Sequence, residues 1–150
     1  MNNIESSRLY NNETFYYAFE KDLQHAVSFV LIESPFITTR RMETLSPIIR
    51  KLRRRGVVIV VNTHNPEEHN HDYAPQAYGA IRTVQDMGVK VLYTVKHHRK
   101  LAIVDDAILW EGSLNILSQS DSCEMMRRIT SRTAVTELLE FTGVQRWLSR

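Results

Sequence analysis

Short, mostly apolar runs alternate with longer amphipathic stretches along most of the chain. The runs at 27–33, 57–61 and 89–94 predict buried strands, because a strand covered on both faces carries apolar residues at successive positions. Around them, apolar residues recur at three- and four-residue spacing, which is typical of helices with one buried face. The helices expected from this spacing cover residues 13–25, 39–55, 77–87 and 133–148.

A hairpin is predicted where two apolar runs within residues 101–110 flank an Asp-Asp pair. Side chains two positions apart on a strand share a face, so His98 and Lys100 are expected to point the same way just before the first run. The hairpin then folds Ser113 and Asn115 back beside that pair. A nucleophile or base, a fixed cation and two small polar groups are therefore expected to converge on one spot.

The remaining pattern completes the expected architecture. A further strand is predicted at 125–130, at the edge of the sheet, and Asn12 and Gly56 are expected to begin the first helix and end the second. Helices and strands first alternate, and several strands in succession then precede a closing helix. This order predicts an α/β fold, a layered domain with a central mixed β-sheet flanked by helices. Residues 1–150 are expected to form this single domain, with residues 1–11 as a flexible arm.

Composition agrees with a globular domain and excludes several other classes. The chain has 150 residues, of which 43% are hydrophobic and 24% charged. A single cysteine, Cys123, excludes an intrachain disulfide. No run approaches the roughly 18 apolar residues of a membrane span, and the first eight residues contain no apolar run that would serve as a secretory signal. We therefore expect a cytoplasmic protein.

The polar residues around the hairpin resemble those of the phospholipase D superfamily. The signature of that superfamily is His-x-Lys, four residues, Asp, six residues, then Gly-Ser-x-Asn. Every position of it is filled here, by His98, Lys100, Asp105, Gly112, Ser113 and Asn115. Six residue types at fixed gaps form a specific signal, and the resemblance implies the layered fold expected above. Glu124 stands where relatives often carry a carboxylate, although Ser122 replaces the Asn that commonly precedes it.

The resemblance implies a role for each site residue. His98 would attack a phosphodiester and form a phosphohistidine, which water or an alcohol then releases. Lys100, Ser113 and Asn115 would bind the phosphate oxygens. Glu124 would orient the imidazole of His98, as the acidic member of a triad does; the ordinary alternative is a solvated carboxylate. This chemistry needs no metal and no other cofactor.

Three neighbouring residues are expected to act differently. Asp105 belongs to the motif but lies at the hairpin turn. Its expected role is therefore mainly structural, in binding the amides of the turn or a nearby cation. His97 and Arg99 face away from the His98 and Lys100 side and are expected to be non-catalytic.

A long polar loop at 62–73 contains three histidines and several acidic residues. The spacing of His64, His69 and His71 matches no standard zinc pattern. Two interpretations stay open at this point, a solvated loop at the rim of the active site and a metal site.

By the same resemblance, one copy of the motif supplies only half of an active site. Family members with a single motif usually pair two copies across a twofold axis, so that one histidine attacks while the other protonates the leaving oxygen. Because the chain contains one motif and no internal repeat, the resemblance implies a homodimer with a shared active site.

The motif does not by itself indicate the class of substrate. The net charge of +2 is too small to indicate a polyanion by itself, but arginines gather in the helix at 39–55. Since lipid enzymes of the superfamily usually carry two motifs in a longer chain, we expect a nuclease, with DNA preferred over RNA. Candidate nucleic-acid-binding residues are Arg40, Arg41, Arg50, Arg53, Arg54 and Ser34. The alternatives are a phospholipase or phosphatidyltransferase, and a nucleic-acid-binding, nuclease-like module of a larger helicase or defence system.

Overall fold

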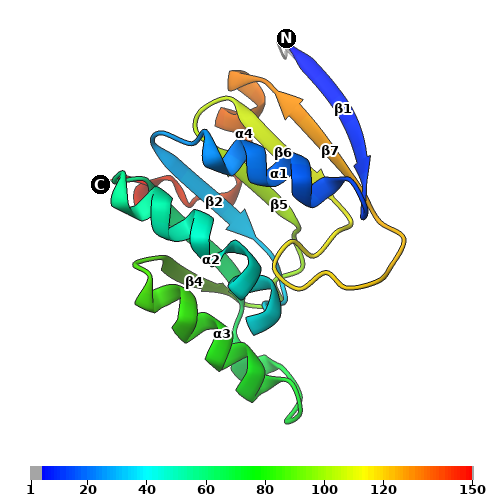
Figure 1. Cartoon of the computed structure of the whole chain (residues 1–150), viewed down its shortest axis with the longest axis vertical. Coiled ribbons are helices and arrows are strands. Elements are labelled where there is room, and N and C mark those ends of the chain that lie inside the picture. The colour runs from blue at the N-terminus through cyan, green and yellow to red at the C-terminus, as the bar shows by residue number, and fades with distance from the viewer. Residues whose placement is uncertain (1–4, 150) are drawn as a thin grey trace.

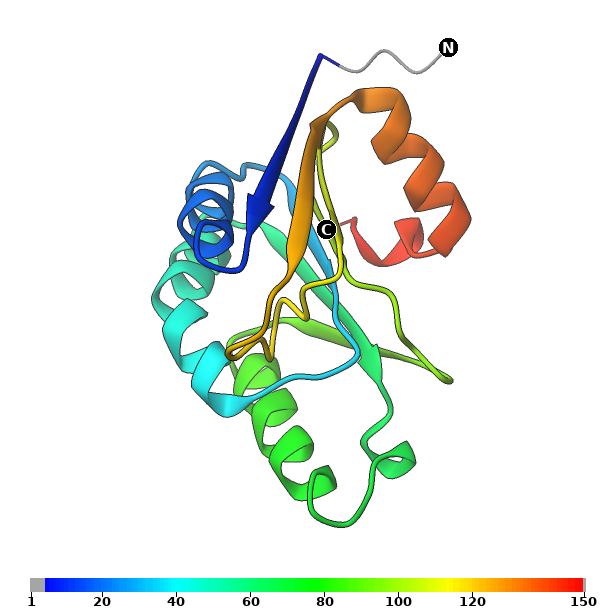
Figure 2. The same ribbon diagram turned by 90° about the vertical axis from the view of Figure 1, so that its right-hand side faces the viewer.

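A computed structural model describes residues 5–149 as one mixed sheet between two unequal layers of helices (Figures 1 and 2). The strands are β1 Ser6–Asn11, β2 Phe29–Glu33, β3 Val58–His64, β4 Lys90–Thr94, β5 Leu101–Val104, β6 Ile108–Gly112 and β7 Met125–Thr130. The helices are α1 Phe15–Gln24, α2 Thr39–Arg54, α3 Ala74–Asp86 and α4 Arg132–Thr142, with short 3-10 turns η1 Pro66–Glu68 and η2 Gln145–Trp147. The α/β architecture expected from the sequence is therefore confirmed.

The sheet topology brings several loops to one edge. The strand order is β1-β7-β6-β5-β2-β3-β4, with β2, β3 and β4 parallel and all other pairings antiparallel. The carboxyl ends of β2, β3 and β4 lie at the same edge as the start of β5, the end of β6 and the start of β7. Ligand sites of open α/β sheets commonly lie beyond the carboxyl ends of the parallel strands. None of the helices in the described part has the length and apolar character that a bilayer crossing requires.

The two faces of the sheet are covered unequally. Helices α1, α2 and α3 pack on one face, and α4 with η2 packs on the other (Figure 2). The larger core lies under α1 and α2, where Trp110 of β6 meets Phe15 edge-on at a centroid distance of 5.1 Å. The indole N–H of Trp110 donates to Asp22 at 2.8 Å, so its polar atom is satisfied inside the core.

Three expectations about the elements were wrong. Residues 6–11 were expected to be part of a loose arm, but they form β1, which pairs with β7. Strand β7 consequently lies inside the sheet rather than at its edge. The last helix ends at Gly143, whose φ of 71° is left-handed, rather than continuing to 148. A glycine there ends a helix readily because it adopts positive φ without a Cβ clash.

The first helix also begins differently from the expectation. Asn12 was expected to cap it, but the side chain of Asn11 accepts hydrogen bonds from the amides of Glu13 and Thr14. The amide oxygen of Asn12 instead accepts from the backbone N–H of Glu124 at 3.4 Å. Asn12 therefore joins the start of α1 to the chain just before β7. The second helix ends as expected before Gly56, which has φ of 80°.

Candidate active site

The β5–β6 hairpin brings the two halves of the motif together. Leu101 pairs with Glu111, and the N–H of Gly112 donates to the carbonyl of Lys100 at 3.4 Å. This register places Ser113 beside the His98–Lys100 segment, as expected from the sequence. Gly112 is required by the packing of β6 on β7, because a Cβ there would lie 2.1 Å from the carbonyl oxygen of Met125.

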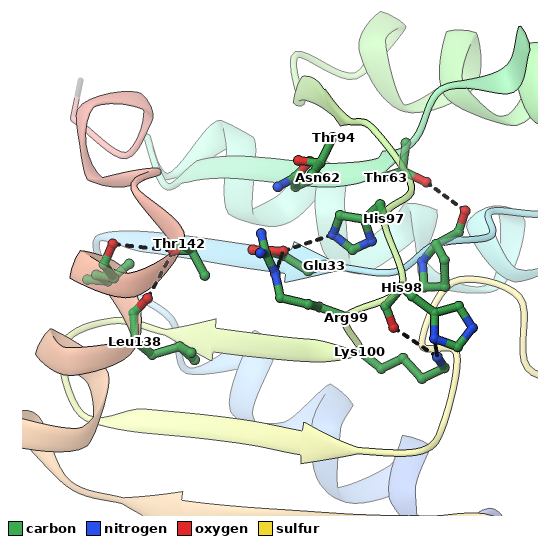
Figure 3. A network of polar contacts seen from close by, with 12 residues as sticks. Glu33, Asn62, Thr63, Thr94, His97, His98, Arg99, Lys100, Leu138 and Thr142 are labelled. Atoms are coloured by element: carbon green, nitrogen blue, oxygen red, sulfur yellow. Dashed lines mark hydrogen bonds and ion pairs between the residues drawn. The ribbon is translucent and has the colours of Figure 1, made fainter. Parts of the chain in front are cut away.

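His98 and Lys100 lie side by side at the edge of the sheet (Figure 3). The Nζ atom of Lys100 lies 3.3 Å from Nδ1 of His98 and donates to the carbonyl of His98 at 3.0 Å. The His98 side chain is exposed, whereas Lys100 is half-buried. Burial lowers the pKa of Lys100, and the nearby carboxylate of Glu124 partly offsets that shift. The pair presents an imidazole and an ammonium group to the same space.

Among the described residues, the side chains of Ser113, Asn115 and Glu124 form no hydrogen bond with the His98 ring. The hydroxyl of Ser113 accepts from the N–H of Met125 at 3.0 Å, which ties the end of β6 to the start of β7. The backbone of Asn115 is held by Gln119, and its side-chain oxygen is buried without a hydrogen-bond partner in the described part. One carboxylate oxygen of Glu124 is likewise buried without a partner. The hydrogen bonds of the described residues do not include one between Glu124 and His98.

Asp105 lies at the other end of β5. Five residue-to-residue steps separate it from Lys100, which correspond to roughly 16 Å of extended strand. Its carboxylate accepts from the backbone N–H groups of Val27, Ser28 and Phe29 at 3.0, 2.7 and 3.1 Å. Asp105 therefore ties the hairpin turn to the start of β2, in agreement with the structural role expected from its position, and it does not join the other motif residues at the site.

An open depression of about 850 Å³ at the edge of the sheet adjoins His98 and Lys100. We call it the His98 depression. It is lined by one histidine and mainly by basic and apolar residues: His98, Arg99, Lys100, Leu101, Glu111, Gly112, Ser113, Met125, Arg127 and Leu138. Three fixed cations against one carboxylate suit an anionic ligand such as a phosphodiester.

Comparison with known proteins gives the family. Residues 19–143 match the family described as cardiolipin synthase, PLD-like domain. The chain belongs to the phospholipase D superfamily. No curated protein matches the chain.

Solved structures of this superfamily share the fold at low sequence identity. Nuc from Salmonella typhimurium, a phospholipase D family member, superposes with a TM-score of 0.74 at 15% identity, covering 97% of this chain and 96% of its own. NucT from Helicobacter pylori gives 0.70 at 17% identity, with 95% of each chain covered. Phosphatidylserine synthase from Haemophilus influenzae Rd KW20 gives 0.65 at 15% identity, covering 93% of this chain and 39% of its own. The fold is therefore that of a phospholipase D domain.

The expected nucleic-acid-binding residues of this phospholipase D domain do not form one surface. Arg40 and Arg41 lie at the start of α2, on the same edge of the sheet as the site. Arg50, Arg53 and Arg54 lie toward its other end, and the helix of 16 residues is about 24 Å long. The guanidinium of Arg53 donates to the carbonyl of Val57 at 2.7 Å, so this arginine fixes the turn into β3.

Two further residues of that group are engaged inside the protein. Ser34 is fully buried, and its hydroxyl donates to the carbonyl of Phe36 and accepts from the N–H of Leu117. A side chain in this position cannot contact nucleic acid, so the expectation for Ser34 was wrong. Arg41 lies 3.7 Å from the ring centre of Tyr16 and donates to the carbonyl of Gln119, which leaves Arg40 as the exposed cation at the start of α2.

Two of the three histidines of the polar loop, His64 and His69, lie in an aromatic cluster. His69 packs against the rings of His64 and Tyr73 at centroid distances of 4.6 and 4.5 Å, and it stacks on Phe36 at 5.4 Å. Burial lowers the pKa of His69, and the neighbouring His64 lowers it further. Within residues 5–149, no group of three or more His, Cys, Asp or Glu side chains is arranged to hold a metal ion.

A buried carboxylate next to the site was not predicted from the sequence. Glu33, the last residue of β2, is fully buried and accepts hydrogen bonds from His97 and Arg99, both at 2.8 Å (Figure 3). His97 and Arg99 point away from the His98 and Lys100 side, as expected, but they meet this carboxylate rather than solvent. The sequence feature that could have indicated this buried carboxylate is a glutamate at the end of an otherwise apolar strand.

Proposed function

We propose that the chain is a metal-independent phosphodiesterase that cleaves nucleic acid, with DNA preferred. The observation that carries this proposal is the contact between His98 and Lys100 at the edge of the His98 depression. It places a nucleophile and a cation where one phosphodiester can meet both. The family of the chain supports the same class of reaction.

The proposed reaction has two steps. A ring nitrogen of His98 attacks phosphorus, an N–P bond forms, and the P–O bond to the leaving oxygen breaks. Water then attacks the phosphohistidine, and the N–P bond breaks to release the phosphate monoester. Lys100 stabilises the negative charge that develops on the phosphate oxygens, and the half-buried side chain of Asn115 supplies a further polar contact.

We infer from the contact of Lys100 with Nδ1 which ring nitrogen of His98 is protonated in the free protein. An ammonium group can only donate, so Nδ1 of His98 accepts, and a neutral ring then carries its proton on Nε2. Attack through Nε2 requires that proton to leave. When a phosphate draws Lys100 away, Nδ1 is free to take up a proton. Glu124 is our candidate to accept the hydrogen bond that this Nδ1–H group then donates.

The leaving oxygen requires a proton from another group. The His98 depression is lined by one histidine, since the ring of His97 is buried against Glu33. We propose that His98 of a second copy supplies this proton across a homodimer. Exposed apolar side chains beside the depression support an interface there: Met125 is 54% exposed, and Phe141 of α4 is 76% exposed.

Two features support nucleic acid as the substrate. Arg127 lines the His98 depression beside Lys100 and would contact a phosphate next to the scissile one. The likeness in fold to Nuc and NucT also supports this choice, since at least 95% of each chain is covered in both comparisons. The likeness to phosphatidylserine synthase favours a phospholipid as the second candidate substrate.

The test is cleavage of labelled single- and double-stranded DNA and RNA, and of phospholipid vesicles, all with excess EDTA. We expect the wild-type protein to cleave DNA, His98→Ala to be inactive, and the control His25→Ala, at an exposed histidine just past the end of α1, to retain activity. Loss of cleavage on chelation, with recovery on adding one divalent ion, would refute the histidine mechanism. Cleavage of vesicles alone would select the lipid substrate, and binding of DNA without turnover would select the binding module.

The shared site has its own test. The dimer requires a sedimentation mass of about 35 kDa, twice the 17.5 kDa of one chain. Mixing wild-type protein with excess His98→Ala should lower the activity per wild-type chain toward zero, because mixed dimers lack one of the two histidines. An active monomer, or unchanged activity per wild-type chain after subunit exchange, would contradict this part of the proposal.

A further inference from the structure

The segment that carries His98 and Lys100 has few backbone hydrogen bonds. Residues 97–100 lie between β4 and β5 and belong to neither strand. Their backbone bonds are those of the N–H of His97 to Thr94 at 3.2 Å and of the carbonyl of Lys100 from Gly112 at 3.4 Å. Both lie at the ends of the segment, so the backbone alone leaves the direction of the His98 side chain weakly defined.

Side chains supply the missing contacts. Oε1 of Glu33 accepts from Nε2 of His97 and from Nε of Arg99, each at 2.8 Å. We call these three residues the Glu33 cluster. The side chains of Glu33 and His97 are fully buried, whereas that of Arg99 is 37% exposed. One carboxylate therefore binds two residues of the segment to the end of β2 (Figure 3).

These two residues alternate with the two residues of the proposed chemistry. In an extended segment, positions 97 and 99 point to one side and positions 98 and 100 to the other. Holding the side chains of His97 and Arg99 on the α4 face therefore fixes the opposite projection of His98 and Lys100. A rotation of the segment that released His98 would have to break both bonds to Glu33.

We propose that Glu33 is a positioning residue of the active site, acting through His97 and Arg99 to hold His98 and Lys100 in register with each other and with Ser113. This inference rests on the proposed role of His98 as the nucleophile. Glu33 itself touches neither the substrate space nor the reacting atoms.

The charge state of the Glu33 cluster agrees with this role. Burial by itself would raise the pKa of Glu33, but the hydrogen bonds and charges of His97 and Arg99 outweigh it and hold the pKa below its usual value. The carboxylate is therefore ionised at neutral pH and attracts both partners. A buried ion pair is a weak source of stability compared with well-packed apolar residues, which favours a role in geometry.

The cluster also contains unsatisfied polar atoms. Oε2 of Glu33 and Nδ1 of His97 are buried without a partner among the described residues. Such groups cost free energy, and a residue kept only for stability would avoid them. A merely structural role predicts that Glu33→Gln lowers stability and leaves turnover of the folded protein unchanged, which separates it from the positioning role.

The test compares Glu33→Gln with Asp22→Asn. Asp22 is the control because its carboxylate also forms an ion pair, partly buried, with Arg128 at 2.8 Å on the other face of the sheet. We expect Glu33→Gln to lower kcat about 10- to 100-fold with KM within about twofold, because a displacement of about 1 Å of a reacting group costs up to about 100-fold in rate. Asp22→Asn should unfold at a lower temperature and keep its kcat within about twofold.

Arg99→Gln provides a second variant. Arg99 is partly exposed, so its replacement removes one of the two bonds to Glu33 without emptying a buried site. We expect a smaller loss of kcat in the same direction. This variant tests the proposal even if Glu33→Gln does not fold.

A readout without turnover separates this proposal from the proposed function. We expect the imidazole NMR signals of His98 to broaden or double in Glu33→Gln, and amide hydrogen exchange of residues 98–100 to accelerate at least about tenfold relative to Asp22→Asn. If the wild-type protein cleaves no phosphodiester, the proposed function fails while these signals still test the positioning. Unchanged His98 signals and exchange rates in Glu33→Gln, or an equal loss of kcat in Asp22→Asn, would overturn the inference.

Discussion

Substitutions of Asp105 distinguish a structural from a catalytic role most clearly among the motif residues. Its carboxylate accepts three backbone N–H groups at the start of β2, and its own φ of 54° is left-handed. Asp105→Ala removes all three bonds, at about 1 kcal/mol each because Val27 and Ser28 are exposed and their amides regain water. Alanine also adopts a left-handed φ at a cost of about 1 kcal/mol.

The two costs predict a graded series. The sum for Asp105→Ala is about 4 kcal/mol, which lowers Tm by about 8–16 °C in a domain of this length. Asp105→Asn keeps one oxygen for Ser28 and Phe29 and tolerates positive φ, so it loses mainly the charge and the bond to Val27. We expect about 1.5 kcal/mol, or a decrease of about 3–6 °C.

The assay is thermal unfolding followed by circular dichroism, with kcat/KM measured well below the lowest Tm. The control is Asp106→Ala, because Asp106 makes only an exposed ion pair with Arg132 at 3.5 Å and its loss should cost at most about 0.5 kcal/mol. We expect all three variants to keep the wild-type kcat/KM when folded. A Tm of Asp105→Ala within about 2 °C of wild type, or a tenfold loss of kcat/KM in folded Asp105→Asn, would refute this reasoning.

Four further variants test the packing and the charges. Gly112→Ala places a Cβ 2.1 Å from the carbonyl oxygen of Met125 and should destabilise the protein by more than about 2 kcal/mol in urea unfolding. Gly79 lies on the exposed face of α3, with no atom within 4 Å of an added Cβ, so Gly79→Ala should stabilise the protein by about 0.5–1 kcal/mol. The pKa of Glu33 in the folded protein lies below its usual 4.5, so the ionised carboxylate stabilises the fold above that pH. The Tm of wild type should therefore exceed that of Glu33→Gln by less and less as the pH falls from about 5 to 3. A Tm difference that stays constant over this range would contradict the prediction. Tyr16→Phe removes the bond of its hydroxyl to the carbonyl of Ile116 at 2.7 Å and should cost about 1 kcal/mol of unfolding free energy.

Most elements of the fold were predictable because their hydrophobic pattern is strong. The apolar strands β2 and β3 and the amphipathic α2 are recognisable without knowledge of their neighbours, since burial on both faces or on one face imposes a period on the sequence. Strand β1 was not, because all but one of its residues are exposed and its pairing with β7 involves the backbone. Backbone hydrogen bonds to a distant strand leave no period in the local sequence.

The candidate site was partly predictable for a related reason. His98, Lys100 and Ser113 lie close in sequence around one hairpin, so strand alternation and a short turn suffice to bring them together. The arginines of α2 were misjudged because clustering in sequence does not give direction. Arg40 and Arg54 lie at opposite ends of this 16-residue helix, and the side chain of Arg53 donates to a backbone carbonyl.

The sequence by itself determined the α/β class, the hairpin, and the motif that assigns the chain to the phospholipase D superfamily. Each of these depends on residues near one another in the chain, where spacing alone fixes geometry. Only the tertiary structure showed that Glu33 meets His97 and Arg99, that Asp105 binds the start of β2, and that Ser34 is buried. These contacts join segments about 65 to 80 residues apart, and the sheet order that brings them together results from packing the whole chain at once.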